Sequence, residues 1–200
     1  HLFGDKYIDY AALSRDGKEF VTAAHYVEGG GMVTLLMRFS VSSEEPLFQA
    51  SFPSELPFGV FYMENGAYAL LTSKALRIYD AQDTMTAEII FGEKSLLGYE
   101  FSDKYAIITY NIPGLSGGTE LIVYRPDGTI AATRSFDGAL LDKKLENDRL
   151  AVLTPGALTI CDLTGGAADQ IRALERDVKQ IFLSEGKVYT FTGGEAQILD

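Results

Sequence analysis

Residues that carry metal-binding and covalent chemistry are scarce in this chain. Its 200 residues include one cysteine, two histidines and no tryptophan. Two histidines and one thiol do not make a zinc site at any familiar ligand spacing, and no D-x-[DN]-x-[DN]-G segment predicts a calcium loop. A single thiol excludes an internal disulfide, which suits either a reducing compartment or an extracytoplasmic bacterial protein that avoids cysteine. We therefore predict no metal site and no cofactor.

The single thiol and the glycine run have ordinary structural interpretations. Cys161 lies between Ile160 and Asp162 in an apolar segment, where a cysteine is most often a small buried hydrophobe. The glycines at 29–31 lie between two apolar segments, with neither a helix start nor a Lys-Ser/Thr pair behind them. We expect a hairpin tip there and not a phosphate cradle.

Basic clusters and long apolar runs are missing as well. The 17 Lys and Arg residues are scattered and outnumbered by 28 Asp and Glu residues, so the net charge is −11. Nucleic-acid binding depends on clustered basic side chains that displace phosphate counterions, so neither nucleic acid nor an anionic membrane surface is an expected partner. No apolar run reaches the roughly 18 residues of a membrane span, and the N-terminus lacks a signal-peptide pattern. We predict that this segment makes no membrane contact.

What the sequence does contain is a repeat. A turn, an apolar strand, a tight connection and a second apolar strand recur five times, most clearly in ENGAYALLTSKALRIYD (64–80) and ENDRLAVLTPGALTICDL (146–163). The equivalent turns at residues 16, 65, 103, 147 and 185 are separated by 49, 38, 44 and 38 residues. Propeller blades of four strands span roughly 40–45 residues. The repeat therefore predicts an all-β propeller of four-stranded antiparallel blades, about five of them in this chain.

We place the repeat units at residues 5–52, 53–92, 93–137, 138–176 and 177–200, with residues 1–4 added to the last. Only ADQIRALERDVKQIF (168–182) has near-helical apolar spacing, but the array requires strands at 170–174 and 178–183, and we favour the strands. Two arrangements of the ends stay open. Residues 1–4 complete the last blade and close a ring, or the chain is the C-terminal part of a larger propeller. Four residues form a small clasp, which favours the second.

Tight turns punctuate the units. Asn65-Gly66 predicts a hairpin turn with positive φ at both central residues. Asp16-Gly17, Asp127-Gly128 and Asp137-Gly138 give the same signal.

Carboxylates on the innermost strands allow one enzymatic hypothesis. Paired carboxylates around a propeller channel can serve as acid and base, or as nucleophile, in glycoside hydrolysis. The acidic residues on the predicted inner strands are Asp9, Glu100 and Asp142. They do not occupy equivalent positions of the repeat, and Lys143 and Lys144 follow Asp142 as ion-pair partners. Solvated or ion-paired acids are the plainer interpretation.

Two long connections allow a binding hypothesis. The segments 24–32 and 110–118 both join the second and third strands of their units, so we expect them on one face of the propeller. They contain His25, Tyr26, Tyr110 and Leu115, which are aromatic and apolar types that anchor interfaces. Lengthening a surface loop costs little entropy, so tolerated insertions are the alternative, and both interpretations stay open.

The repeat resembles WD40-like and quinoprotein propeller repeats. Tyr79-Asp80 and Cys161-Asp162 hold the place of the Trp-Asp dipeptide, Tyr124-Arg125 departs from it, and the Gly-His signature is absent. The segments ALSRDGKEFVTAAHYVEGGG, LRIYD, YEFSDKYAIITYN and ELIVYRPDG are similar to an uncharacterised bacterial family, a domain of unknown function, of membrane-anchored propellers. This resemblance implies an N-terminal membrane anchor in the full protein and a propeller outside the cytoplasm, on the cell surface. It implies neither an activity nor a quinone cofactor.

The expected function is therefore a non-catalytic extracytoplasmic binding or scaffolding propeller with a protein or glycan partner. The alternative is a glycosidase-type hydrolase that uses the inner-strand carboxylates.

Overall fold

The computed structural model describes residues 6–112, 117–174 and 177–199, and almost all regular structure in them is β. The first sheet contains β1 (Tyr7–Leu13), β2 (Glu19–Glu28), β3 (Gly31–Ser40) and β4 (Pro46–Pro53). The second contains β5 (Pro57–Tyr62), β6 (Tyr68–Thr72), β7 (Ala75–Tyr79) and β8 (Met85–Ile90), with the 3-10 turn η1 (Glu64–Gly66) between β5 and β6.

The remaining strands form three more sheets. The third contains β9 (Leu96–Phe101), β10 (Ala106–Asn111), β11 (Thr119–Tyr124) and β12 (Ile130–Phe136). The fourth contains β13 (Asp142–Glu146), β14 (Arg149–Thr154), β15 (Ala157–Asp162) and β16 (Gln170–Ala173). The fifth contains β17 (Gln180–Ser184), β18 (Lys187–Phe191) and β19 (Ala196–Leu199).

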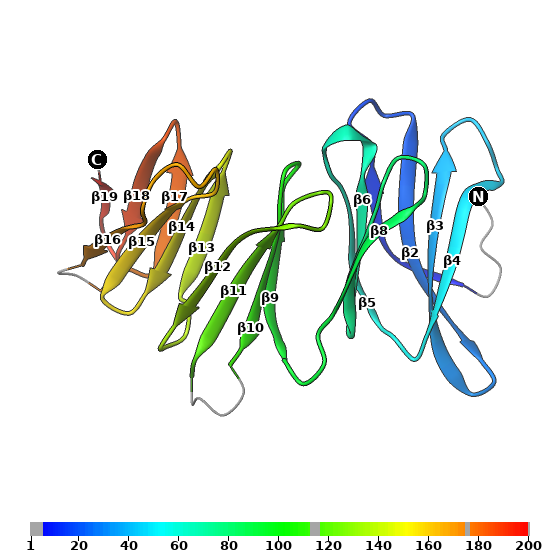
Figure 1. The fold of residues 1–200 in the computed structure, drawn as a ribbon, viewed down its shortest axis with the longest axis horizontal. Helices are drawn as coiled ribbons and strands as arrows, with labels where there is room; N and C mark the ends of the chain where they lie inside the picture. The colour runs from blue at the N-terminus through cyan, green and yellow to red at the C-terminus, as the bar shows by residue number, and fades with distance from the viewer. Residues whose placement is uncertain (1–5, 113–116, 175–176, 200) are drawn as a thin grey trace. The chain divides into compact units, whose positions relative to one another are not determined.

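Each sheet is a meander in which strands that follow one another in the chain are neighbours (Figure 1). The predicted all-β fold of four-stranded antiparallel units, about five in number, is confirmed. The segment 168–182 contributes β16 and the start of β17, as the array required, and its described residues form no helix. In the described part of the chain, no helix is long and apolar enough to span a membrane.

The chain divides into two compact units. Unit 1 comprises residues 1–96, 100–106 and 124–129, and unit 2 comprises residues 97–99, 107–123 and 130–200. The third sheet contributes to both. In unit 1 the first and second sheets share an apolar core in which Val21, Ala23 and Leu36 contact Tyr68 and Leu70. All five side chains are 0% exposed, and their strands contain runs of consecutive buried residues, because these inner strands are covered on both faces.

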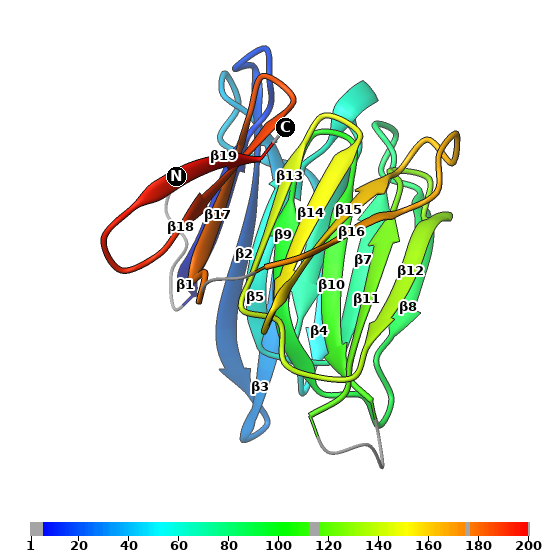
Figure 2. The ribbon, with the colours of Figure 1, turned by 90° about the vertical axis from the view of Figure 1, so that its left-hand side faces the viewer.

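In unit 2 the fourth and fifth sheets pack in the same way. Leu153 and Leu158 of the fourth sheet and Ile181 and Val188 of the fifth belong to one buried cluster. Gln180–Ser184 and Lys187–Phe191 alternate between exposed and buried positions, which shows that one face of this sheet supplies the core contacts. Figure 2 shows the fifth sheet, in red and orange, from the side.

A buried ion cluster joins the first two sheets. The guanidinium of Arg38 on β3 donates to both carboxylate oxygens of Asp83, at 2.7 and 2.6 Å, and to Glu19 at 2.7 Å. The hydroxyl of the buried Tyr68 also donates to Asp83, at 2.7 Å. Burial, followed by this hydrogen bond, raises the pKa of Tyr68 well above its usual value. Satisfied networks of this kind fix how one sheet packs on the next.

The turn predictions are partly right. Asn65 and Gly66 both have positive φ, at 59° and 75°, as predicted. At Asp16-Gly17 and Asp127-Gly128 only the glycine is in the left-handed region, and at Asp137-Gly138 neither residue is. In the first two of these turns the aspartate instead accepts a hydrogen bond from the residue two positions further on: Asp16 from Lys18, and Asp127 from Thr129.

The predicted long connection at 24–32 is wrong. β2 and β3 continue as a ladder to the pair Glu28↔Gly31, so that only Gly29 and Gly30 form the turn. Their φ values of 58° and 82° suit a two-residue hairpin that follows the strand twist. The glycine run is therefore the tip of a long hairpin.

Candidate binding pocket

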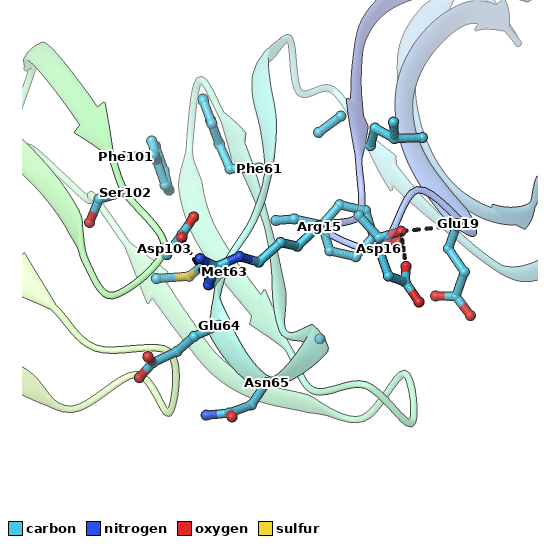
Figure 3. Close-up of a pocket in the computed structure, with 15 residues that line it drawn as sticks. Arg15, Asp16, Glu19, Phe61, Met63, Glu64, Asn65, Phe101, Ser102 and Asp103 are labelled. Atoms are coloured by element: carbon cyan, nitrogen blue, oxygen red, sulfur yellow. Dashed lines mark hydrogen bonds and ion pairs between the residues drawn. The ribbon is translucent and has the colours of Figure 1, made fainter.

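A pocket in unit 1 lies where the first strands of three sheets end. It has a volume of about 740 Å³ and is lined by the end of β1 with the following turn, by residues 61–66 at the end of β5, and by residues 101–103 at the end of β9. Figure 3 shows these segments converging on one opening. The three lining segments occupy equivalent positions in their repeat units, because the chain turns from the first strand to the second at the same end of each sheet.

Local hydrogen bonds fix the turn after β1. Asp16 accepts hydrogen bonds from the Ser14 hydroxyl, at 2.9 Å, and from the backbone N–H of Lys18, at 3.1 Å. These bonds, the one from Lys18 first, lower the pKa of Asp16. The carboxylate therefore stays ionised at the rim of the pocket.

The turns after β5 and β9 are tied to each other. The backbone N–H of Glu64 donates to the carbonyl of Asp103 at 2.6 Å. Ser102 closes its own turn by accepting a hydrogen bond from the backbone N–H of Tyr105 at 3.1 Å. These bonds hold the two turns together, and Glu64 and Asp103 both line the opening.

Two aromatic rings form an apolar wall. Phe61 and Phe101 stack with ring centroids 3.6 Å apart and an interplanar angle of 5°. Gly59 makes room for this pair, because a Cβ at that position would lie 2.6 Å from the Phe61 ring. The two stacked rings form one side of the opening.

Charge around the opening is predominantly negative. Asp16, Glu19, Glu64 and Asp103 line the pocket, with Arg15 as the opposite charge. Glu19 is held by Arg38, as described above, and Glu64 forms no ion pair with a described residue. Because low-dielectric walls focus the field of such groups, the pocket attracts cations.

One polar group in the wall lacks a partner. The hydroxyl oxygen of Tyr62 is buried and forms no hydrogen bond with a described residue. Burial and then the carboxylate of Glu19 raise its pKa to about 12, so the hydroxyl stays protonated and can both donate and accept. Buried polar atoms in native proteins are nearly always hydrogen-bonded, so this hydroxyl is one of a few exceptions among the described residues.

The predicted binding residues His25 and Tyr26 lie on β2 and do not line this pocket. The His25 ring nitrogen Nδ1 lies 2.6 Å from the carboxylate of Asp9, and Tyr7 stacks on the histidine at 5.4 Å. The ammonium of Lys6 lies over the Tyr26 ring at 5.8 Å. The structure thus brings together Asp9 and His25, which the sequence interpretation had assigned to different functions.

The other two predicted binding residues lie elsewhere. Tyr110 belongs to β10, which runs to Asn111, and is 1% exposed. It is therefore a buried strand residue and not part of an exposed connection. Leu115 lies outside the described residues.

Of the candidate catalytic carboxylates, Asp142 is engaged by its surroundings. It accepts a hydrogen bond from the backbone N–H of Ile181 at 3.0 Å, and the Lys144 ammonium lies 3.2 Å away. Glu100 is half-buried on β9, next to Phe101, and Asp9 is paired with His25. Among the described residues, no group of three or more His, Cys, Asp and Glu side chains could hold a metal ion.

A smaller pocket of about 400 Å³ lies in unit 2, at the turn between β13 and β14. Two of its charged side chains, Glu146 and Arg149, already have backbone partners. The Glu146 carboxylate accepts the N–H groups of Glu185 and Gly186, each at 3.0 Å, and the Arg149 guanidinium donates to the Gly186 carbonyl. These residues tie the fifth sheet to the fourth, so the unit 1 pocket is the better candidate for a ligand.

The pocket residues Arg15, Phe61, Glu64 and Asp103 were missed by sequence reasoning. A signal was present, because positions 16, 65 and 103 are the turns on which the repeat units align. Equivalent turns of a propeller share one end of the blades, and loops at such ends commonly carry binding residues.

Solved structures with a similar fold are WD40 β-propellers. The chain superposes on Sqt1 from Chaetomium thermophilum with a TM-score of 0.62 and 12% identity, covering 98% of this chain and 58% of that one. The WD40 domain of Neurospora crassa Pan2 gives a TM-score of 0.53 and 11% identity, covering 92% and 59%. Kluyveromyces lactis Hsv2 gives 0.51 and 12%, covering 93% and 57%. The chain thus spans less than two thirds of each of these structures.

These likenesses and the five antiparallel meanders show a WD40-like β-propeller fold. No curated protein matches the chain significantly in sequence. A family model matches residues 1–199, and the chain therefore belongs to the family of unknown function DUF5711.

Proposed function

We propose that this chain is a non-catalytic propeller segment that binds or scaffolds a protein partner, and that the partner docks at the unit 1 pocket. The observation that carries this proposal is the pocket itself. Its volume of about 740 Å³ is within the range of typical ligand sites. It combines an aromatic wall with an acidic rim, which can give a partner an apolar anchor contact and charge complementarity.

A protein segment suits this pocket better than a glycan. Sugar rings are usually held on open aromatic faces by neutral polar groups, whereas Phe61 and Phe101 are stacked on each other and the rim is charged. Sqt1 provides a precedent for the fold, since it has been crystallised bound to the N-terminus of a ribosomal protein. The glycosidase alternative gains no support, because Asp9 and Asp142 are both paired.

The proposed setting is outside the cytoplasm, on a membrane-anchored protein of a bacterial cell surface. The support is the resemblance of its segments to membrane-anchored propellers, and the single cysteine is compatible with this setting. Protease treatment of intact cells tests this setting. Cleavage of the propeller without lysis is expected, and full protection would contradict it.

Selection from a displayed library of random peptides tests the docking site. The protein carrying Glu64→Lys with Asp103→Lys is compared with a matched control, Glu45→Lys with Glu93→Lys, which reverses two exposed carboxylates of unit 1 outside the pocket. Enriched peptides should bind the wild type and the control equally and the pocket variant at least about tenfold more weakly, as truncating an interface anchor does. The proposal would be refuted if no peptide is enriched or if the enriched peptides bind all three proteins equally. It would also be refuted if the protein binds only to glycans when these are presented on an array.

A further inference from the structure

Arg15 crosses the pocket from one wall to another. Its side chain leaves the turn after β1, passes Met63 and ends beside Asp103 at the turn after β9, as Figure 3 shows. The guanidinium Nη1 lies 3.6 Å from the Asp103 carboxylate. The positively charged Arg15 side chain therefore already lies next to Asp103, one of the carboxylates that line the pocket.

This contact is loose compared with the other arginine of the same region. The side chains of Arg15 and Asp103 are 90% and 64% exposed, and their single contact is longer than the 2.7–2.9 Å of charge-assisted hydrogen bonds. Arg38, by contrast, is 11% exposed and makes three bonds of 2.6–2.7 Å. Exposed ion pairs contribute little stability, so Arg15 can leave Asp103 at small cost whereas Arg38 is fixed.

We infer that Asp103 and Glu64 form a subsite for a basic side chain of the partner, and that Arg15 occupies this subsite until the partner displaces it. The inference rests on the proposed function and names the class of its ligand: a peptide segment that presents arginine or lysine.

One further observation fits a displaceable occupant. Glu64 has no ion pair with a described residue, so the subsite offers an incoming cation a carboxylate that Arg15 does not use. A bound basic segment thus gains contacts that Arg15 alone does not make.

Calorimetric titration with two synthetic peptides, one of alternating Gly and Arg and one of alternating Gly and Glu, tests the inference on the full 200-residue chain. Arg15→Ala should strengthen binding of the Arg peptide about fivefold or more, the size of a typical coupling between competing groups. Asp103→Asn should weaken it by a similar factor. Lys74→Ala, which removes an exposed cation outside the pocket, should leave the affinity unchanged.

Two results would contradict the inference. If Arg15→Ala weakens or does not change binding of the Arg peptide, Arg15 is no competitor and the inference fails. If the Glu peptide binds the wild type and Arg15→Ala abolishes that binding, the pocket recognises an anion and the inference fails as well. In either case, the library selection decides the proposed function separately. If the selected peptides bind the Glu64→Lys, Asp103→Lys variant more weakly than the wild type, the proposed function stands. If they bind both proteins equally, the proposed function is refuted as well.

Discussion

At the scale of single residues, unit 1 contains a second buried ion cluster besides that of Arg38. The Arg77 guanidinium, 7% exposed, donates to both oxygens of Glu55, at 2.7 and 2.9 Å, and lies 4.1 Å from the centroid of the Phe52 ring. Burial raises the pKa of Glu55, but the hydrogen bonds from Arg77 and Thr72 and the nearby positive charge more than offset it, so the pKa lies below its usual value. Buried charges persist only when paired in this manner.

Glu55→Gln should destabilise the protein in a pH-dependent way. A carboxyl whose pKa is lowered by folding contributes stability above its unfolded pKa, about 4.3, and loses it as the pH falls through the folded value. We expect the variant to lose about 3 kcal/mol of unfolding free energy at pH 7, because it leaves Arg77 buried with a weakened partner. The difference from wild type should shrink as the pH falls from about 4.3, the unfolded value, through the lowered folded-state pKa of Glu55. Urea unfolding at pH 7 and pH 3.5 measures this, and a constant difference would contradict it.

The pairing of Asp9 with His25 shows why some contacts escape a sequence interpretation. Ile8 pairs with Ala24 and Tyr10 with Ala23, so Asp9 is the extra residue of a bulge in β1. A bulge breaks the two-residue alternation and redirects a side chain. Nothing in the local sequence marks its position, whereas the pairing of Asp142 with a following lysine needs only the neighbouring residues and was predicted.

At the scale of elements, strand positions followed from periodicity more readily than the lengths of connections. The strands at 170–174 and 178–183 were placed correctly from the repeat, although the local sequence favours a helix. The segment 24–32 looked like a loop because of its polar and glycine content. The cross-strand ladder continues through it nonetheless, since an exposed hairpin end needs only backbone pairing and a turn that tolerates positive φ.

Gly128→Ala tests how the turn between β11 and β12 packs in unit 1. Gly128 has φ 80°, and a Cβ there would lie 2.1 Å from the Cβ of Ala87 on β8. Left-handed strain and overpacking should together cost about 2–4 kcal/mol. Gly92→Ala is the matched control, since its φ is 60° but no atom lies within 4 Å of the added Cβ.

Urea unfolding of both variants measures the difference. We expect Gly92→Ala to lose only the strain of its backbone conformation, about 1 kcal/mol. Equal losses in the two variants would mean that the turn does not pack against β8 as described.

At the scale of the whole molecule, the repeat alone predicted the fold, because each unit is one meander that must bury its faces against its neighbours. The pocket could not be predicted in the same way. Its walls come from residues 12–16, 19, 61–66 and 101–103, and only the packing of three sheets brings them together. The repeat identifies equivalent turns but not which of them surround a cavity, nor that Arg15 reaches across to Asp103.

The central claim is that unit 1 recognises a basic segment at this pocket. The most direct measurement is a map of backbone amide chemical-shift changes in the isotopically labelled chain during titration with the Gly-Arg peptide. Binding at the pocket predicts the largest changes at residues 14–18, 63–67 and 102–105, and their loss in Asp103→Asn. Changes concentrated instead at the hairpin tip, residues 28–31, or around the unit 2 pocket, residues 146–149, would contradict the claim.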